Sequence, residues 1–544
     1  MVETGSGVRS FGYTGGTGGA VSIINSGTIT ATGADGDGIL VLAGNSATTI
    51  DNSGQINGAS GLVLAGGSNT IVNKGLISGA AGEGIIATGT TSLDNADSIV
   101  GSGGIAVQLS AADETVTLRT SSNVTGMIAA GGGTDAANLI GTTSTAASSQ
   151  TIAAFSGFDS LDVHSGYWTA PSTNGSVFTS SVTIAAGSSL DDANGATGLS
   201  VSAPIVDNGT LVVRSSAGSA GSTFGGSVVT GTGNVLLTGA GNVTLDGTNS
   251  IQTTETTTID GGTTTILTGT QGGNFVTNSG GTLQIGTGGT SGLFTGNLVD
   301  NGALFVNRSD TYTIGGSLTG SGTLTKSGAG QLVLASGYAF TGTTNILGGS
   351  IKVSGTVAPT TQLAVTGSGQ IDLSGSPETV AALSGDSAAV SINLTGGSLT
   401  VNQATSTTFA GNLTGDGSLV KAGSGRLNVA GANNYTGPTT VSGGMLSVNG
   451  SIVSATTVAS DGTLGGNGTI SAPVMIAAGG IIAPGSSIGT LNINGNLTLN
   501  TGSIYEVEAN AAGQADRINV TGIATLAGTV QVVPTEGSYP NLTS

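Results

Sequence analysis

The single histidine of the chain offers the first possible catalytic group. His164 follows Asp162 by two positions and precedes Ser165, and a carboxylate, an imidazole and a hydroxyl are the groups of a nucleophilic triad. Neighbouring residues of a strand point to opposite faces, so Ser165 is not expected to meet His164 locally. A second hydroxyl pattern, G-x-S-x-G, lies at Gly485–Gly489. A nucleophile elbow needs a helix after this pattern, whereas a strand-like segment follows here, so no catalytic residue is predicted.

Paired carboxylates could serve a β-helical enzyme that cleaves polysaccharides. Asp191 and Asp192 are neighbours in an expected turn, where both side chains are predicted to be solvated. Glu506 and Glu508 share one face of a predicted strand. A lyase acting on acidic sugars would also need a cation beside them, and Arg517 is the basic residue near them in sequence. A polysaccharide lyase or hydrolase is therefore the alternative function.

Two acidic stretches resemble fragments of calcium loops. Asp35 and Asp37 lie in Ala-Asp-Gly-Asp-Gly, which lacks the closing glutamate of a calcium loop. Residues 131–135 resemble part of a calcium-binding nonapeptide, but that motif is not iterated here. Because the chain also has no cysteine, we predict no metal site and no cofactor.

The composition narrows the fold class before any element is placed. Of 544 residues, 100 are Gly, and only 7% are Asp, Glu, Lys or Arg, against roughly 25% in ordinary domains. The ten basic residues among 29 acidic ones cannot form a phosphate-tracking stripe, so no nucleic-acid partner is expected. A mean hydropathy of +0.27 disfavours disorder. The abundance of β-branched residues, Gly and Asn indicates short strands joined by tight turns.

Near the N-terminus two phrases recur with the period of a β-helix coil. Asn25, Asn52, Asn73 and Asn95 are spaced by 27, 21 and 22 residues, and a Gly-apolar phrase recurs between them. Two strands and their turns in about 22 residues fit one coil of a parallel β-helix. Stacked coils would place each asparagine over the next, so these four side chains are predicted to form a hydrogen-bonded ladder.

A longer repeat occupies the C-terminal half. Gly316–Gly355 and Gly411–Gly450 align without a gap and share 18 of 40 residues. An upstream copy at residues 229–243 is degenerate, with Leu237 at the place of the lysine. The recurring leucines, Leu318, Leu324, Leu332, Leu413, Leu419 and Leu427, are predicted to point inward and stack along the axis. Lys326 and Lys421 are predicted to lie at the surface or in a turn, because an unpaired buried ammonium is costly.

This repeat resembles the passenger-associated transport repeat of autotransporters, the type V secreted proteins of Gram-negative bacteria. Its pattern L-x-G-x-G-x-L-x-K-x-G-x-G-x-L is filled at residues 318–332 and 413–427. Residues 482–491, 495–499, 505–508 and 516–522 resemble the autochaperone region that precedes the translocator barrel in that family. The resemblance implies a non-enzymatic, stalk-like or adhesin-like passenger that is exposed at the cell surface or secreted. Its implied partners are an outer-membrane translocator β-barrel, whose strands are not recognised in this sequence, and host-cell, matrix or other cell surfaces. No signal peptide is recognised either.

We therefore expect an all-β chain that forms a right-handed parallel β-helix of about 24 coils. The expected parts are N-terminal coils (1–110), an aromatic junction with Phe155, Phe158 and Trp168 plugging the core (111–170), a central β-helix (171–310), the two repeats (311–455) and a C-terminal cap (456–544). The cap is predicted to be the most stable part and to template the folding of the rest, because an open last coil exposes unpaired strand edges.

Overall fold

The protein is built from short strands that stack in parallel, coil upon coil. Its computed structural model describes residues 11–13, 19–42, 47–143, 145–146, 150–170, 176–192, 199–201, 203–215, 222–224, 228–247, 251–252, 256–336 and 338–534. These residues contain no α-helix, and within them no helix is long and apolar enough to cross a membrane. The strands form a β-solenoid of about 22 turns, which confirms the predicted fold class. The expected 24 coils are slightly too many, because several coils are longer than the assumed period.

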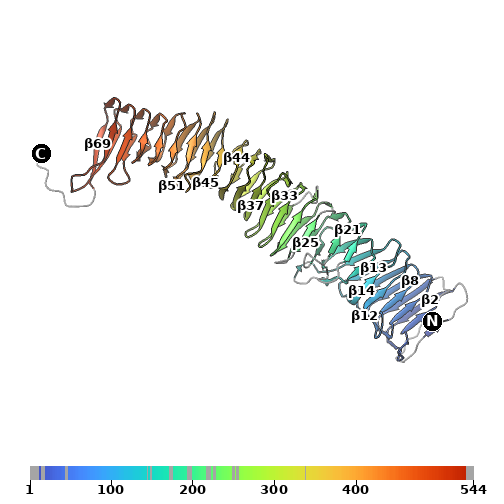
Figure 1. Ribbon diagram of the computed structural model, residues 1–544. Helices are drawn as coiled ribbons and strands as arrows, with labels where there is room; N and C mark the ends of the chain where they lie inside the picture. Colours follow the sequence, from blue (N-terminus) through green and yellow to red (C-terminus); the bar gives the residue numbers. More distant parts are fainter. Residues whose placement is uncertain are drawn as a thin grey trace. The chain divides into compact units, whose positions relative to one another are not determined.

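Two compact units divide the chain, Met1–Asn274 and Phe275–Ser544. In each unit, successive strands of a sheet come from successive coils, as Figure 1 shows by the stacked arrows of similar colour.

In the first unit, one sheet comprises β2 (Ala20–Asn25), β5 (Ala47–Asn52), β8 (Ser68–Asn73), β11 (Thr91–Asn95), β13 (Thr115–Arg119), β15 (Ala136–Ile140), β18 (Ser160–Ser165), β21 (Ser181–Ile184), β24 (Ile205–Asp207) and β27 (Val229–Thr230). A second comprises β1 (Phe11–Tyr13), β4 (Ile39–Val41), β7 (Leu62–Leu64), β10 (Ile85–Ala87), β12 (Ser98–Gln108), β9 (Leu76–Gly79), β6 (Gln55–Gly58) and β3 (Thr28–Thr30), with β14 (Asn123–Ala129) and β17 (Phe155–Ser156) attached. Further strands of this unit are β16 (Gln150–Thr151), β19 (Tyr167–Thr169), β22 (Ser189–Asp191), β25 (Thr210–Ser215), β28 (Asn234–Gly239) and β30 (Thr256–Ile259).

In the second unit, one sheet contains β37 (Ala303–Asn307), β40 (Thr323–Ser327), β43 (Thr343–Ile346), β45 (Gln362–Gly367) and β48 (Ala382–Ser384), and another contains β36 (Leu298–Asp300), β39 (Leu318–Gly320) and β42 (Tyr338–Phe340). A third has β38 (Tyr312–Ile314), β41 (Gln331–Leu334), β44 (Ser350–Val353), β46 (Gln370–Asp372), β49 (Ser391–Asn393) and β52 (Asn412–Thr414). The last coils contribute β47 (Pro377–Val380), β50 (Ser398–Asn402), β53 (Ser418–Ala422), β56 (Thr439–Val441), β59 (Thr456–Val458), β62 (Val474–Ile476), β65 (Leu497–Leu499) and β68 (Ala524–Leu526). They also contribute β51 (Thr407–Phe409), β54 (Arg426–Val429), β57 (Gly444–Val448), β60 (Gly462–Gly466), β63 (Ile481–Pro484), β66 (Ile504–Ala509) and β69 (Thr529–Pro534), and finally β55 (Ala432–Asn433), β58 (Ser451–Ile452), β61 (Thr469–Ile470), β64 (Thr490–Ile493) and β67 (Arg517–Val520).

The predicted asparagine ladder is confirmed. The Nδ2 group of Asn25 donates to Oδ1 of Asn52 at 2.7 Å, Asn52 donates to Asn73 at 2.8 Å, and Asn73 donates to Asn95 at 2.7 Å. All four side chains are buried at the ends of β2, β5, β8 and β11. Each amide therefore satisfies a polar group inside the solenoid that would otherwise lack a partner.

The predicted apolar column of the repeats is also confirmed. All six leucines named above have 0% of their surface exposed. Leu324 pairs in register with Leu304 of the previous coil and Thr344 of the next, and Leu419 pairs in the same way with Leu399 and Thr439. The two repeats thus reproduce the same packing at equivalent positions.

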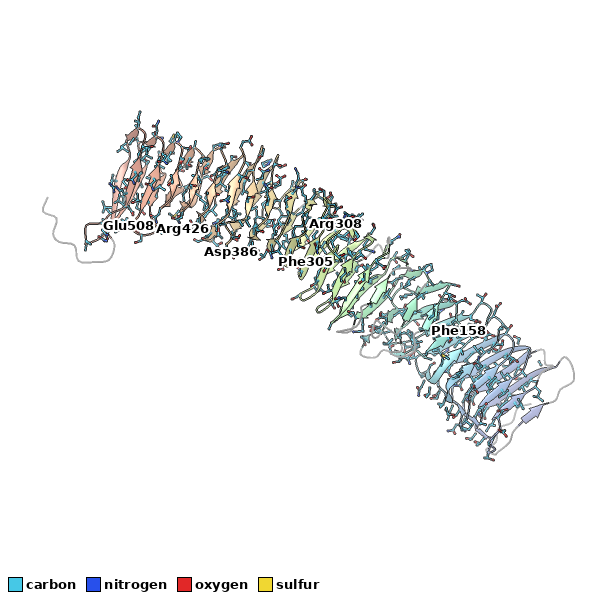
Figure 2. The ribbon with its side chains drawn as sticks, in the orientation of Figure 1. Phe158, Phe305, Arg308, Asp386, Arg426 and Glu508 are labelled. Atoms are coloured by element: carbon cyan, nitrogen blue, oxygen red, sulfur yellow. The ribbon has the colours of Figure 1, made fainter. Side chains whose placement is uncertain are left out.

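The aromatic residues of segment 111–170 are buried, as predicted. Phe155 and Phe158 meet edge to face with ring centroids 4.9 Å apart, and Figure 2 marks Phe158 in the first unit. Trp168 is also buried, and its indole N–H donates to the carbonyl of Ser165 at 2.8 Å. The three rings therefore fill the core of the solenoid in this segment.

Candidate functional site

The proposed triad residues do not form a catalytic arrangement around His164. His164 is exposed at a register irregularity of β18, while Asp162 pairs in register with Asn138 and Thr183. The hydroxyl of Ser165 donates to the carbonyl of Gly141 at 2.8 Å. The Ser165 hydroxyl is therefore oriented by backbone rather than by the imidazole.

The prediction that Asp191 and Asp192 are solvated is wrong. Both side chains are buried, with 2% and 7% of their surface exposed. Arg214 of the next coil reaches Asp191 with Nη2 to Oδ2 at 2.7 Å, and the hydroxyl of Tyr167 donates to the same oxygen at 2.8 Å. The sequence shows the acidic pair but not the arginine, because that partner comes from the following coil, 23 residues away.

Asp192 lies beside this ion pair and has a different environment. Its Oδ1 accepts the backbone N–H of Arg214 at 2.6 Å. Burial raises the pKa of Asp192 to about 7, although this hydrogen bond and the nearby guanidinium oppose the shift. The pair thus contains one ion-paired carboxylate and one carboxyl group that takes up a proton near neutral pH.

The other candidate carboxylates are not assembled into one centre. Asp35 is exposed, whereas Asp135 is buried inside the first unit. Glu506 and Glu508 lie on β66 and Arg517 on β67, and no ion pair among the described residues joins them. Within the described ranges, no three acidic or histidine side chains converge as a metal site.

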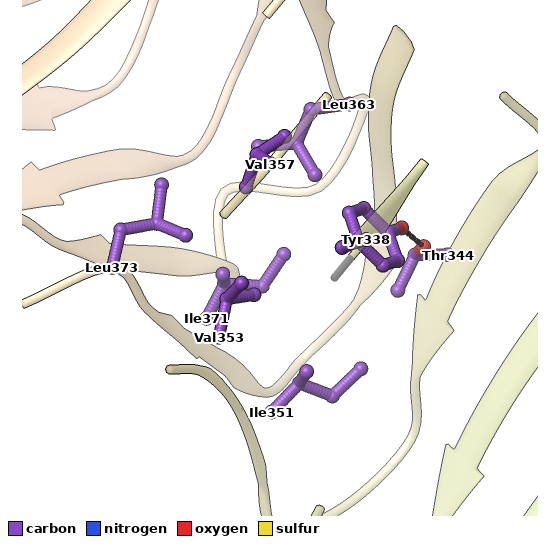
Figure 3. A pocket seen from close by; sticks show the side chains of 8 residues that line it. All are labelled: Tyr338, Thr344, Ile351, Val353, Val357, Leu363, Ile371 and Leu373. Atoms are coloured by element: carbon purple, nitrogen blue, oxygen red, sulfur yellow. Dashed lines mark hydrogen bonds between the residues drawn. The ribbon is translucent and has the colours of Figure 1, made fainter. Parts of the chain in front are cut away.

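The interior of the second unit has a small cavity, shown in Figure 3. It measures about 10 Å³ and is bounded by aliphatic side chains together with Tyr338 and Thr344, whose hydroxyl groups lie 2.6 Å apart. This volume admits about one water molecule and no organic ligand.

The G-x-S-x-G residues form a loop that crosses the outside of the solenoid; we call residues 485–489 the strap. The strap connects β63 to the strand β64, so it is not a nucleophile elbow. Arg426 of β54 donates through Nη2 to the Ser486 hydroxyl at 2.7 Å and to the Ser447 hydroxyl at 2.9 Å. Ser447 lies between two inward-facing residues and should face outward, yet it is fully buried. The strap and Arg426 therefore cover the outer face of the sheet at this point.

A glycine of β60 lets the strand that precedes the strap, β63, pack closely. A Cβ atom on Gly465 would lie 2.3 Å from the carbonyl oxygen of Ala483 and 2.5 Å from the Met445 side chain. Gly485 begins the strap with a φ of 89°, a conformation that favours glycine, and forms an antiparallel bridge to Gly466.

Asp516 holds the other end of the strap. Its Oδ1 accepts the backbone N–H of Gly489 at 2.8 Å, and its Oδ2 accepts that of Glu508 at 2.8 Å. The Tyr505 hydroxyl donates to the Asp516 carbonyl at 3.2 Å. Figure 2 marks Arg426 and Glu508, which belong to the two ends of this arrangement. The strap motif is visible in the sequence, but its anchors are not, because they lie up to 60 residues away.

The lysines of the two repeats lie within strands β40 and β53 and are buried, so the prediction that they lie at the surface or in a turn is wrong. Lys326 and Lys421 have 1% and 0% of their surface exposed. The Lys421 ammonium donates to the carbonyls of Ala422, Gly423 and Gly443 at 2.6, 3.0 and 3.2 Å. Lys326 donates in the same way to Ser327, Gly328 and Gly348. Three carbonyl oxygens compensate the desolvated charge, and one of the three comes from the next coil, which is why the burial is not evident from the sequence.

Each lysine joins its own coil to the next. Gly348 and Gly443 belong to the Gly-Gly turn one coil later, 22 residues beyond the lysine. Burial lowers the pKa of both amines, that of Lys421 to about 8. At the equivalent place in the degenerate copy, Leu237 is fully buried, which shows that the position is interior in all three copies.

The two segments that contain these lysines match a known protein family. The passenger-associated-transport-repeat family matches residues 324–353 and 419–448, which contain both lysine cages. These two segments are similar to passenger-associated transport repeats. It is also similar to a protein named Adhesin BmaC autotransporter from Brucella suis biovar 1 (strain 1330), with 33% identity over 159 residues. The matched part is 27% of this chain and 5% of that relative, and no solved structure matches the chain.

Two buried turn aspartates make stability dependent on pH. Asp207 and Asp300 occupy equivalent Val-Asp-Asn-Gly turns, and each accepts the N–H of the glycine two residues later, at 2.9 and 3.1 Å. Their Oδ2 atoms have no hydrogen-bond partner in the described part of the chain. Burial raises the pKa of both carboxyl groups from 3.8 to about 6.

The folded state therefore binds protons more tightly than the unfolded state at these sites. The stabilisation is complete below the unfolded pKa of 3.8 and is lost as the pH rises through about 6. Between about pH 5 and about pH 7 the free energy of unfolding should fall, and we expect this fall to be about 1 kcal/mol smaller in Asp207→Asn than in the unchanged chain. Urea titrations followed by the fluorescence of the buried Trp168 would measure the free energy of unfolding of the first unit at each pH. An unchanged pH dependence, equal to that of the exposed control Asp246→Asn, would contradict the assignment.

Proposed function

We propose that the chain is part of the passenger of a Gram-negative autotransporter, displayed at the cell surface or secreted, with a non-enzymatic, stalk-like and adhesive role. The observation that carries this proposal is the pair of transport repeats, each with the same lysine cage, inside a parallel β-solenoid. The named adhesin relative supports it. The partners proposed are an outer-membrane translocator barrel and host-cell, matrix or other cell surfaces.

Binding without cleavage would distinguish this function from a carbohydrate-active enzyme. The purified chain, immobilised on beads, is expected to adhere to cultured cells or matrix-coated surfaces. In parallel, acidic polysaccharides incubated with it are expected to keep their length. Depolymerisation at a rate that depends on the concentration of the chain would favour the lyase or hydrolase and contradict the proposal.

We also propose that residues 456–544 promote folding of the coils before them. The strap supports this role, because it links Arg426, Ser447 and Gly466 from successive coils to Asp516 near the end of the described chain. Such long-range fastening stabilises several coils at once, and a stable end of a solenoid can nucleate the stacking of its neighbours.

Removing one anchor of the strap tests the folding role. Asp516→Ala is expected to slow refolding from urea several-fold and to increase aggregation, because two backbone N–H groups lose their acceptor. Refolding followed by circular dichroism and light scattering would measure both. Glu506→Gln, on the strand β66 that Asp516 contacts through Glu508, is the matched control and should refold like the unchanged chain.

Limited proteolysis addresses the direction of folding. If the C-terminal part is the more stable, a C-terminal fragment should persist longest in the intact chain. Survival of a fragment containing residues 1–170 instead would reverse the proposed polarity, whatever the result of the adhesion assay.

A further inference from the structure

A second column of polar side chains runs inside the first unit. It contains one residue per coil at or just before the start of a strand, namely Thr48, Asn69, Thr91, Glu114 and Asp135, and none of them is more than 2% exposed. Thr48 pairs in register with Asn69, and Asn69 pairs with Thr91, to which its Nδ2 donates at 3.2 Å. The first three residues of the column are neutral, whereas the last two, Glu114 and Asp135, are acids stacked on each other.

Glu114 and Asp135 are in direct contact across two coils. Oδ1 of Asp135 accepts the backbone N–H of Glu114 at 2.9 Å, and Oε1 of Glu114 accepts the Ser110 hydroxyl at 2.8 Å. The remaining oxygens, Oε2 of Glu114 and Oδ2 of Asp135, are buried and have no hydrogen-bond partner among the described residues. Two fully charged carboxylates in this position would each leave one desolvated oxygen uncompensated.

The charged groups around the pair are also acidic. Asp113 is exposed and accepts the N–H of Thr134 at 2.8 Å. In the next coil, Oδ2 of Asp159 accepts the N–H of Asp135 at 2.9 Å. The arginine at the other end of β13, Arg119, is paired with Asp94 at 2.6 Å. No ion pair in the described ranges includes Glu114 or Asp135, so no base offsets their mutual repulsion.

We propose that Glu114 and Asp135 share one proton in the folded protein and form a joint between two coils that tightens at acidic pH. A proton fits the site better than a metal cation, because no third acidic ligand converges there in the described part of the chain. The proton is taken up from solvent as the coil closes over the pair. At alkaline pH it is lost, and two like charges then face each other in the core.

The electrostatics of Glu114 agree with this geometry. Burial, followed by the adjacent Asp135 carboxyl, raises its pKa from 4.5 to about 7. A group with a raised pKa stabilises the folded state below its unfolded pKa, and this contribution is lost as the pH rises through about 7. The joint is therefore expected to loosen between mildly acidic and mildly alkaline conditions.

Hydrogen exchange in β13 and β15 is the direct test. After correction for intrinsic rates, these strands should exchange about ten-fold more slowly near pH 5.5 than near pH 8. Glu114→Gln places a permanent donor beside Asp135 and should remove most of this difference while retaining slow exchange at the higher pH. Asp97→Asn, an exposed acid of the same unit, is the control and should keep the wild-type pH dependence. Exchange that stays pH-dependent in Glu114→Gln would overturn the proposal.

Two further measurements keep the proposal falsifiable if Glu114→Gln folds poorly. In infrared spectra of the full chain near neutral pH, the protonated-carboxyl band, to which Asp192 also contributes, should be smaller in Asp135→Asn and Glu114→Gln than in the unchanged chain, but unchanged in Asp97→Asn. Calcium chloride added near pH 8 should leave exchange in β13 and β15 unchanged. Protection by calcium that depends on Glu114 would show a cation site in place of a shared proton.

Discussion

Leu419→Ala is expected to lower the free energy of unfolding of the second unit by about 2–5 kcal/mol, as is typical for truncation of a buried leucine. Leu419 is fully buried and is stacked between Leu399 and Thr439, so the shortened side chain leaves a cavity inside a continuous column. Leu324→Ala should cost a similar amount, because Leu324 has the equivalent neighbours in the first repeat.

The control lies one residue away. Val420 faces the outside of the same strand and is only partly buried, so Val420→Ala should change stability much less. Urea titrations followed by circular dichroism, with hydrogen exchange in β53, would measure both variants. If Leu419→Ala and Val420→Ala lowered the free energy of unfolding by equal amounts, Leu419 would not be a core residue.

The fold was predictable because the coil period is visible in the sequence. The asparagines near the N-terminus recur at the coil spacing, and the structure places their amides in one ladder. The leucines of the repeats recur with the alternation of a strand and are all buried. Both predictions use only the rule that equivalent positions of a repeat stack on one another.

The errors concern charged residues whose partners come from another coil. Strict alternation from Leu324 places Lys326 on the inner face, but the cost of burying an ammonium favoured the surface or a turn. The carbonyl cage that lowers this cost is formed partly by a Gly-Gly turn 22 residues later. Asp191 was misplaced for the same reason, because Arg214 neutralises it from the next coil.

The strap was only partly predictable. Its residues are recognisable as a motif, but most inter-coil bonds join residues about one coil apart, whereas Arg426 reaches Ser486 over 60 residues. No periodicity in the sequence signals that contact. Arg426 is also the residue of the second repeat at the position of Gln331 in the first, so the repeat alignment gives no indication of its role.

Lys421→Ala is expected to be among the most destabilising single changes in the second unit, at about 3–5 kcal/mol. It removes the donor for three carbonyl oxygens and leaves a cavity between Val401 and Val441, the apolar residues that pair with Lys421 in register. Lys421→Met keeps most of the side-chain volume but removes the donor. It should lower the free energy of unfolding by about 1–3 kcal/mol, which measures the loss of the hydrogen bonds without a cavity. Lys352→Met, at a partly exposed lysine paired with Asp372, should cost no more than about 1 kcal/mol.

The pH dependence of these variants separates a buried ammonium from a side chain that merely packs. The folded pKa of Lys421 is about 8 against 10.5 when unfolded, so the folded state releases its proton first. The free energy of unfolding of the unchanged chain should therefore rise as the pH increases from about 8 toward about 9.5, before the tyrosines titrate. Lys421→Met should lose the part of this rise that belongs to Lys421, while Lys352→Met should retain it. A rise of equal size in both variants would show that the Lys421 amine remains hydrated in solution and that its carbonyl cage does not hold the two coils together.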